Sequence, residues 1–122
     1  MHAILDDAAR RAQAYIKSLE TRSVAPLPEA VAALRQLEEP LPCGPTDPAE
    51  SLALLDRIVS PATMGMAGPR FFGFVIGGSL PGALGANWLA GAWDQNASFY
   101  DSMPGVSHLE QVAMRWVTEL LD

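Results

Sequence analysis

Few side chains in this 122-residue sequence are of a type that performs chemistry. Lys17 is the one lysine, and therefore the one side chain able to form a Schiff base with an aldehyde cofactor. We expect it on the polar side of a helix, and His108 in the first turn of another helix, facing solvent. Ser79 and Ser107 are interpreted as helix caps, and Cys43 as an exposed thiol in a proline-rich loop. The residues alone predict no complete catalytic machinery.

Two short patterns each allow two interpretations. The run at 77–79, Gly-Gly-Ser before a predicted helix, is either an anion-binding turn, because free N–H groups at a helix start attract anions, or simply a tight turn. The polar residues at 94–96 and 100–101 form either part of a site or a capped helix end and a solvated loop. The aromatic residues nearby are predicted to be core or interface residues rather than a substrate box: Phe71, Phe72 and Phe74.

The composition limits the class of protein. The net charge is −6, hydrophobic residues make up 49% and charged residues 18%, so the chain is too apolar to be disordered. An acidic chain without a basic cluster is not expected to bind nucleic acid or an anionic membrane. The single cysteine and two distant histidines predict no disulfide and no metal site. The acidic start lacks a signal peptide's pattern, and the apolar run 80–93 is shorter than the ~20 residues of a spanning helix, so a cytoplasmic location is expected.

Three short helices are predicted in the first half. Apolar residues at spacings of three and four indicate a helix over 3–20, followed by an extended stretch and a short helix near 31–37. Asp47-Pro48 with Glu50 is a typical helix start, and this third helix ends at Ser60-Pro61. Such helices cannot close a core alone, so we expect them to lie against other protein.

The second half has a different character, because Asp94 is the only charged residue between Phe71 and Tyr100. The pattern predicts an extended segment over 70–78, a helix ending near Trp93, and a final helix starting near Ser107. A nearly uncharged helix is buried on most of its surface, yet little of the chain is left to cover it, which points to a partner. The apolar ending at residues 120–121 is typical of a cut within a longer chain.

Several motifs, in order along essentially the whole chain, resemble the N-terminal region of group II pyridoxal-phosphate-dependent decarboxylases, the aromatic-amino-acid and glutamate decarboxylase-like family, with the bacterial members most similar. The motifs are Arg22-Ser-Val-Ala-Pro26, the proline-rich segment with Asp47-Pro48, Gly68-Pro-Arg-Phe-Phe-Gly-Phe-Val75, Gly78-Ser79-Leu80-Pro81, Trp93-Asp-Gln-Asn96, and Pro104 through Leu109-Glu110 to Trp116.

This resemblance implies a type I aminotransferase-like (α/β) fold working as a homodimer, of which this chain is a mainly α part. Residues 1–67 would be a helical segment that wraps the other subunit, and residues 68–122 a strand-like segment and helices leading into the incomplete cofactor-binding domain. By match of motif, the walls of the amino-acid substrate pocket would include Phe74, Val75, Ile76, Gly77, Gln95, Asn96, Ser98, Phe99 and Tyr100.

The resemblance also implies what this chain does not contain. The family's cofactor lysine, the ring-stacking histidine and the aspartate that pairs with the pyridine nitrogen lie farther along, so no bound pyridoxal phosphate and no catalytic residue is expected here. Gly68 stands where family members commonly have His, and Ile76-Gly77 where aromatic-amino-acid decarboxylases have Pro-Thr, which argues against an aromatic substrate. The prediction is an N-terminal part of an amino-acid decarboxylase, inactive alone. The alternatives are a non-catalytic helical dimerisation module and a small anion-binding protein using residues 77–79.

Overall fold

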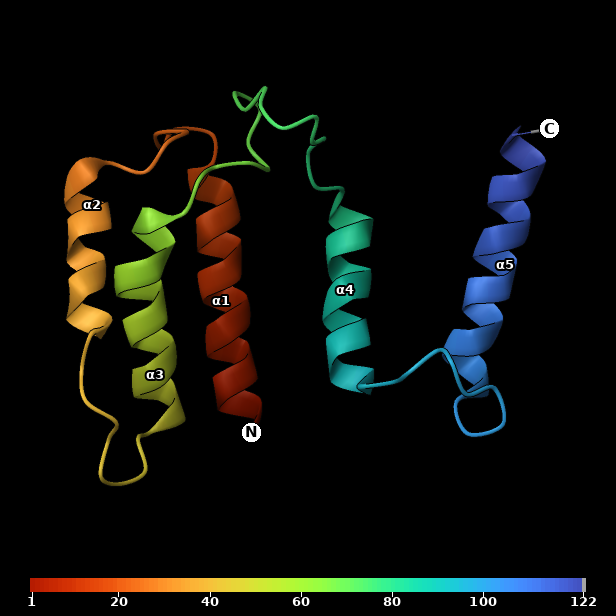
Figure 1. The fold of residues 1–122 in the computed structure, drawn as a ribbon, viewed down its shortest axis with the longest axis horizontal. Helices are drawn as coiled ribbons and strands as arrows, with labels where there is room; N and C mark the ends of the chain where they lie inside the picture. Colours follow the sequence, from red (N-terminus) through yellow and green to blue (C-terminus); the bar gives the residue numbers. More distant parts are fainter. Residues whose placement is uncertain (122) are drawn as a thin grey trace. The chain divides into compact units, whose positions relative to one another are not determined.

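The computed structural model describes residues 1–121, and within that range the chain is mainly α-helical and contains no β-strand (Figure 1). The chain forms two compact units, Met1–Gly78 and a second that starts at Ser79. The domain boundary predicted after residue 67 belongs to the larger aminotransferase-like fold, and it stays a prediction.

The first unit consists of three helical segments, as the periodicity predicted. They are α1 (His2–Ser18), α2 (Pro28–Ala33) with the 3-10 turn η1 (Leu34–Leu37), and α3 (Pro48–Leu54). A π-helical turn η2 (Leu55–Val59) and a 3-10 turn η3 (Ser60–Ala62) continue α3 without a break. The predicted cap of α3 is confirmed, because the Asp47 carboxylate accepts a hydrogen bond of 2.8 Å from the Ala49 amide.

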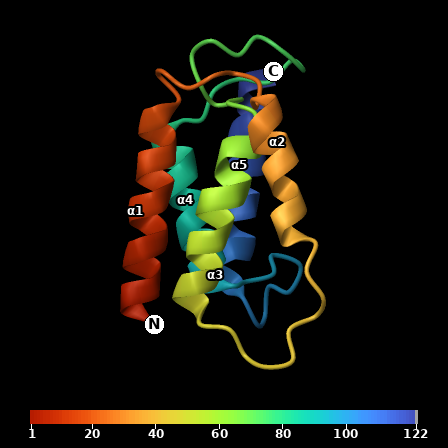
Figure 2. The ribbon, with the colours of Figure 1, turned by 90° about the vertical axis from the view of Figure 1, so that its left-hand side faces the viewer.

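The run from α3 to η3 lies between α1 and α2 and contacts both (Figure 2). Only two hydrophobic side chains are buried among the described residues, Leu19 just after α1 and Ile58 in η2. The apolar stripe of α1 is therefore only partly covered, and Leu5 and Ile16 remain exposed. This agrees with the expectation that these helices do not close a core by themselves.

The segment that follows η3 differs from the extended run predicted for residues 70–78. Phe74 and Val75 adopt left-handed backbone conformations, with φ of 57° and 55°, and interrupt the extended chain. A strand needs a partner for its backbone groups, and within residues 1–121 no strand is available to pair with this segment.

The second unit contains α4 (Pro81–Trp93) and α5 (Pro104–Leu121). The predicted start of the last helix near Ser107 is wrong, because the helix begins three residues earlier at Pro104, a residue that suits the first helical position. Ser107 is therefore no cap; it is buried, and its hydroxyl donates a hydrogen bond of 2.7 Å to the Ala97 carbonyl. The predicted cap at Ser79 is also wrong, since Leu80 precedes α4 and makes no side-chain cap.

Within residues 1–121, no helix combines the length and the apolar character needed to cross a bilayer.

Candidate functional site

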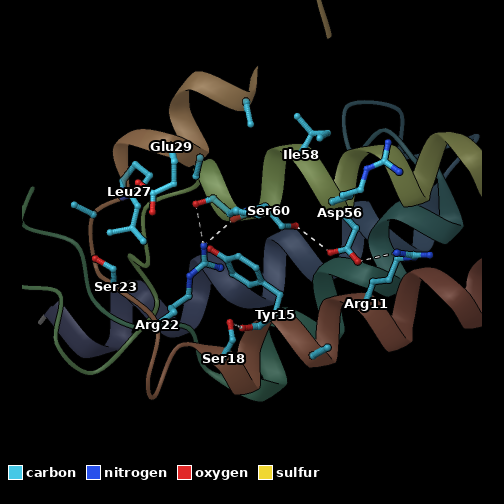
Figure 3. Close-up of a pocket in the computed structure, with 17 residues that line it drawn as sticks. Arg11, Tyr15, Ser18, Arg22, Ser23, Leu27, Glu29, Asp56, Ile58 and Ser60 are labelled. Carbon is cyan, nitrogen blue, oxygen red and sulfur yellow. Dashed lines mark hydrogen bonds and ion pairs between the residues drawn. The ribbon is translucent and has the colours of Figure 1, made fainter. Parts of the chain in front are cut away.

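A cavity of about 670 Å³ opens in the first unit between α1, the segment before α2, and the η2–η3 turns (Figure 3). Charged, polar and apolar side chains all line it, and residues of α2 contribute as well. The lining includes Arg11, Tyr15, Arg22, Asp56, Ile58 and Ser60.

An ion-pair network joins α1 to η2 on one side of this cavity. The Arg11 guanidinium donates to the Asp7 carboxylate at 2.8 Å, one turn away, and to the Asp56 carboxylate at 2.7 Å. Ser60 also donates to Asp56, at 3.2 Å, and Arg10 forms a further ion pair with Asp7. Arg11 is thus shared between two acids: its pair with Asp7 lies within α1, and its pair with Asp56 joins α1 to η2.

A closed ring of four groups joins the end of α1 to the end of η3. Arg22 places its guanidinium 4.6 Å from the centre of the Tyr15 ring and donates to the Ser60 carbonyl at 2.7 Å. The Thr63 hydroxyl also donates to that carbonyl, at 2.7 Å. The single hydroxyl hydrogen of Thr63 is thereby used, so the Tyr15 hydroxyl is the donor in its 2.8 Å bond to Thr63 Oγ1. We call Tyr15, Arg22, Ser60 and Thr63 the Arg22 ring.

The Arg22 ring has a clear electrostatic reason. The carbonyl groups of Ser60, Pro61 and Thr63 lie at the carboxyl end of the α3–η3 run, which is the negative end of its dipole, so a cation there is favourable. Sequence reasoning did not find this ring. The available signal was Arg22 in the RSVAP motif, but its partners lie up to 41 residues away.

Because of the ion-pair network, we expect the first unit to lose stability at acid pH. The hydrogen bond from Arg11 is the main cause that lowers the pKa of Asp7 below its ordinary 3.8, with the nearby charges of Arg11 and Arg10 adding to it. A carboxyl group whose pKa is lower in the folded state contributes stability above its unfolded pKa and loses it as the pH falls through the folded value.

We therefore expect the urea midpoint of the first unit to be constant above pH 5 and to fall below about pH 3.8. The variant Asp7→Asn should have a lower midpoint at pH 7 and a flatter decrease between pH 5 and pH 2, whereas Asp6→Asn, an exposed neighbour, should behave like the parent chain. Circular dichroism at a series of pH values measures both. Parallel curves for the parent and Asp7→Asn would contradict the assignment.

The predicted pocket residues of the first unit lie together on an exposed segment outside the cavity. Phe74 is 71% exposed and Val75 fully exposed, and Ile76 and Gly77 follow them at the surface. The Phe74 ring contacts that of Phe71, with centres 5.6 Å apart. A side chain at Gly77 would meet open space, so nothing in the first unit covers this segment.

The predicted pocket residues of the second unit lie in the loop between α4 and α5. Asp94 ends α4 in a left-handed conformation, with its amide bonded to Ala90, and Asn96 Oδ1 accepts from the Ser98 amide at 2.9 Å. Gln95 Nε2 donates to the Trp93 carbonyl at 2.8 Å. Phe99 and Tyr100 are 59% and 54% exposed at the tip of this loop.

These contacts support the interpretation of residues 94–96 as a capped helix end, and the loop is ordered by its own hydrogen bonds. The two groups of predicted pocket residues belong to different units.

The other chemistry-bearing residues are dispersed. Lys17, Cys43 and His108 are exposed, as predicted. Neither Lys17 nor the Gly-Gly-Ser run at 77–79 lines the cavity. Among residues 1–121, no group of three His, Cys, Asp or Glu side chains is arranged to hold a metal ion. Like Lys17, Cys43 and His108 are not among the residues that line the cavity.

Comparisons with protein families, with curated proteins and with solved structures gave no match to this chain.

Proposed function

We propose that this chain is the N-terminal part of a pyridoxal-phosphate-dependent amino-acid decarboxylase with a type I aminotransferase-like fold. In that enzyme it contributes dimer interface and walls of the substrate pocket, and it is inactive alone. The ordered set of motifs from Arg22 to Trp116 supports the family. The observation that carries the proposed role is the amount of apolar surface that the chain leaves uncovered.

The uncovered surface is larger than folded units of this size expose. The chain has an accessible surface of 9914 Å². Two separately compact units of these lengths would together expose about 7,600 Å², by the relation between surface and mass of folded monomers. The difference, about 2,300 Å², is within the range that permanent interfaces bury. A chain of this kind is expected to be completed by further protein.

The positions of the exposed apolar residues support the same role. Trp88, Leu89 and Trp93 are exposed on the nearly uncharged α4, and α5 exposes apolar residues along its length. The exposed residues of α5 are Leu109, Met114, Trp116, Val117, Leu120 and Leu121. Burial of such side chains is worth roughly 1.5–3 kcal/mol each, so a helix that leaves them in water lacks its partner.

The described residues do not fit pyridoxal phosphate. A cofactor site needs a lysine inside a pocket and an acid near the pyridine nitrogen. Lys17, the one lysine, is exposed on α1 and does not line the cavity. Arg11 and Arg22, which reach into the cavity, are already engaged by protein oxygens. The proposed role of this chain is therefore limited to shaping and covering a site whose cofactor is held elsewhere.

The test is to express the product of the complete reading frame that encodes these residues beside the 122-residue chain. With pyridoxal phosphate, we expect the complete product to keep an imine absorption band after dialysis and to release CO₂ from an amino acid. The 122-residue chain should keep no band. Lys17→Arg in the complete product is the matched control, and it should retain both band and activity. A complete product without a stable band, or a stable band on the short chain, would contradict the proposal.

The alternative is a non-catalytic helical dimerisation module that uses the apolar surface of the second unit. The same exposed residues of α4 and α5 favour this alternative. The experiment on the complete product distinguishes it from the decarboxylase part. A module would associate with itself while its complete product binds no cofactor and releases no CO₂.

A further inference from the structure

The Arg22 ring connects two segments that are distant in the sequence. The side chain of Arg22 spans from the Tyr15 ring in α1 to the carbonyl of Ser60, the first residue of η3. Weaker contacts of 3.5 Å reach the carbonyl groups of Pro61 and Thr63. One arginine thus holds the point at which the chain leaves the third helix.

The segment just beyond that point, residues 63–70, is attached to the same end of α1 by backbone contacts. The Gly65 amide donates to the Val24 carbonyl at 2.8 Å. A side chain at Gly68 would come within 3.2 Å of the Leu19 carbonyl oxygen, so the two backbones are in close contact there. Arg70 donates to the backbone carbonyl of Arg22 itself. We call residues 63–70 the strap.

The segment after the strap has few contacts of its own. Phe72 is 93% exposed and Val75 fully exposed, and the principal side-chain contact is that between the Phe71 and Phe74 rings. Since a segment with few contacts does not fix its own position, the position of residues 71–77 depends on the strap that carries it.

We propose that Arg22 is a positioning residue that fixes the strap and, through it, the place of residues 71–77. The functional part of this inference rests on the proposed function, which puts Phe74–Gly77 in the wall of a substrate pocket. Arginine suits this place because its planar face stacks on the Tyr15 ring while its Nη2 donates to the Ser60 carbonyl. A lysine keeps the charge but lacks the planar group that stacks on the ring.

Amide hydrogen exchange of the 122-residue chain tests the positioning role without any enzyme activity. In Arg22→Ala, we expect the amides of Gly65 and Phe71 to exchange about tenfold faster, because hydrogen bonds from a charged group are lost. Amides in the middle of α1 should change by less than about twofold if the opening is local. Arg22→Lys should rescue part of the protection, and Arg35→Ala, an exposed arginine on η1, should change nothing.

Arg70→Ala provides a second variant that leaves the Arg22 ring intact. It should accelerate exchange at Phe71 and leave Gly65 protected. An equal acceleration of all amides in Arg22→Ala would overturn the proposal, since Arg22 would then be a general stabiliser. Unchanged exchange at Gly65 in Arg22→Ala would overturn it as well. If the exchange pattern is as expected but the complete product lacks decarboxylase activity, the positioning role of Arg22 is supported. Only the assignment of Phe74–Gly77 to a substrate pocket is then rejected.

Discussion

Replacement of Gly68 by histidine is expected to lower the free energy of unfolding of the first unit by about 1–3 kcal/mol. A side chain at this position begins 3.2 Å from the carbonyl oxygens of both Gly65 and Leu19. These are backbone atoms, which cannot move aside as a flexible side chain does. Because Leu19 is one of only two hydrophobic side chains buried in the described chain, displacement there disturbs much of the existing core.

The measurement is urea unfolding followed by two signals. All three tryptophans, Trp88, Trp93 and Trp116, lie in the second unit, so their fluorescence reports that unit alone. We expect the circular dichroism midpoint to fall in Gly68→His while the fluorescence transition is unchanged. Gly44→Ala is the matched control, because a side chain there meets open space, and its effect should be within about 0.5 kcal/mol. Equal midpoints for Gly68→His and the parent would show that the close approach to Leu19 does not exist.

The same position bears on the resemblance. The resemblance places a histidine where this chain has Gly68. In this structure the strap lies so close to Leu19 that a side chain at Gly68 would meet backbone atoms at 3.2 Å.

We expect the chain to associate with itself. Charged residues introduced on one face of α5 should weaken this association. Trp116 and Leu120 are 62% and 85% exposed and stand four residues apart, on one face of the helix. At tens of micromolar concentration, light scattering after size exclusion should give at least twice the 13.0 kDa of one chain. The double variant Trp116→Glu, Leu120→Glu should dissociate at least about tenfold more readily, because each carboxylate would have to lose its water in the interface.

Gln111→Glu is the matched control for this pair, since it introduces a carboxylate at an exposed polar position of the same helix. It should associate like the parent chain. A parent chain that remains a monomer at these concentrations would contradict self-association through this surface. A dimer would be compatible with both the decarboxylase part and the dimerisation module, which only the complete product distinguishes.

The local features of the fold were predictable from the sequence. The helices α1 and α4 follow from apolar periodicity and from Pro81, and the start of α3 follows from Asp47-Pro48. The errors also have local causes. Pro104 was a usable signal for the start of α5, but the spacing of Ser107 and Glu110 was interpreted as a capping box instead. Phe74 and Val75 have high strand propensity, which does not anticipate left-handed conformations in a segment without a pairing strand.

The sequence by itself determined a mainly helical, acidic chain with too much apolar surface for its own length, because composition and periodicity are properties of neighbouring residues. Only the tertiary structure decided that Arg22, Tyr15 and Thr63 form one ring, and that Gly68 touches the end of α1. Apart from the contact between Arg22 and Tyr15, these contacts join residues about 40–50 positions apart, and no short-range pattern encodes such pairs. The tertiary structure also shows that the predicted pocket residues from Phe74 to Gly77 belong to the first unit and those from Gln95 to Tyr100 to the second.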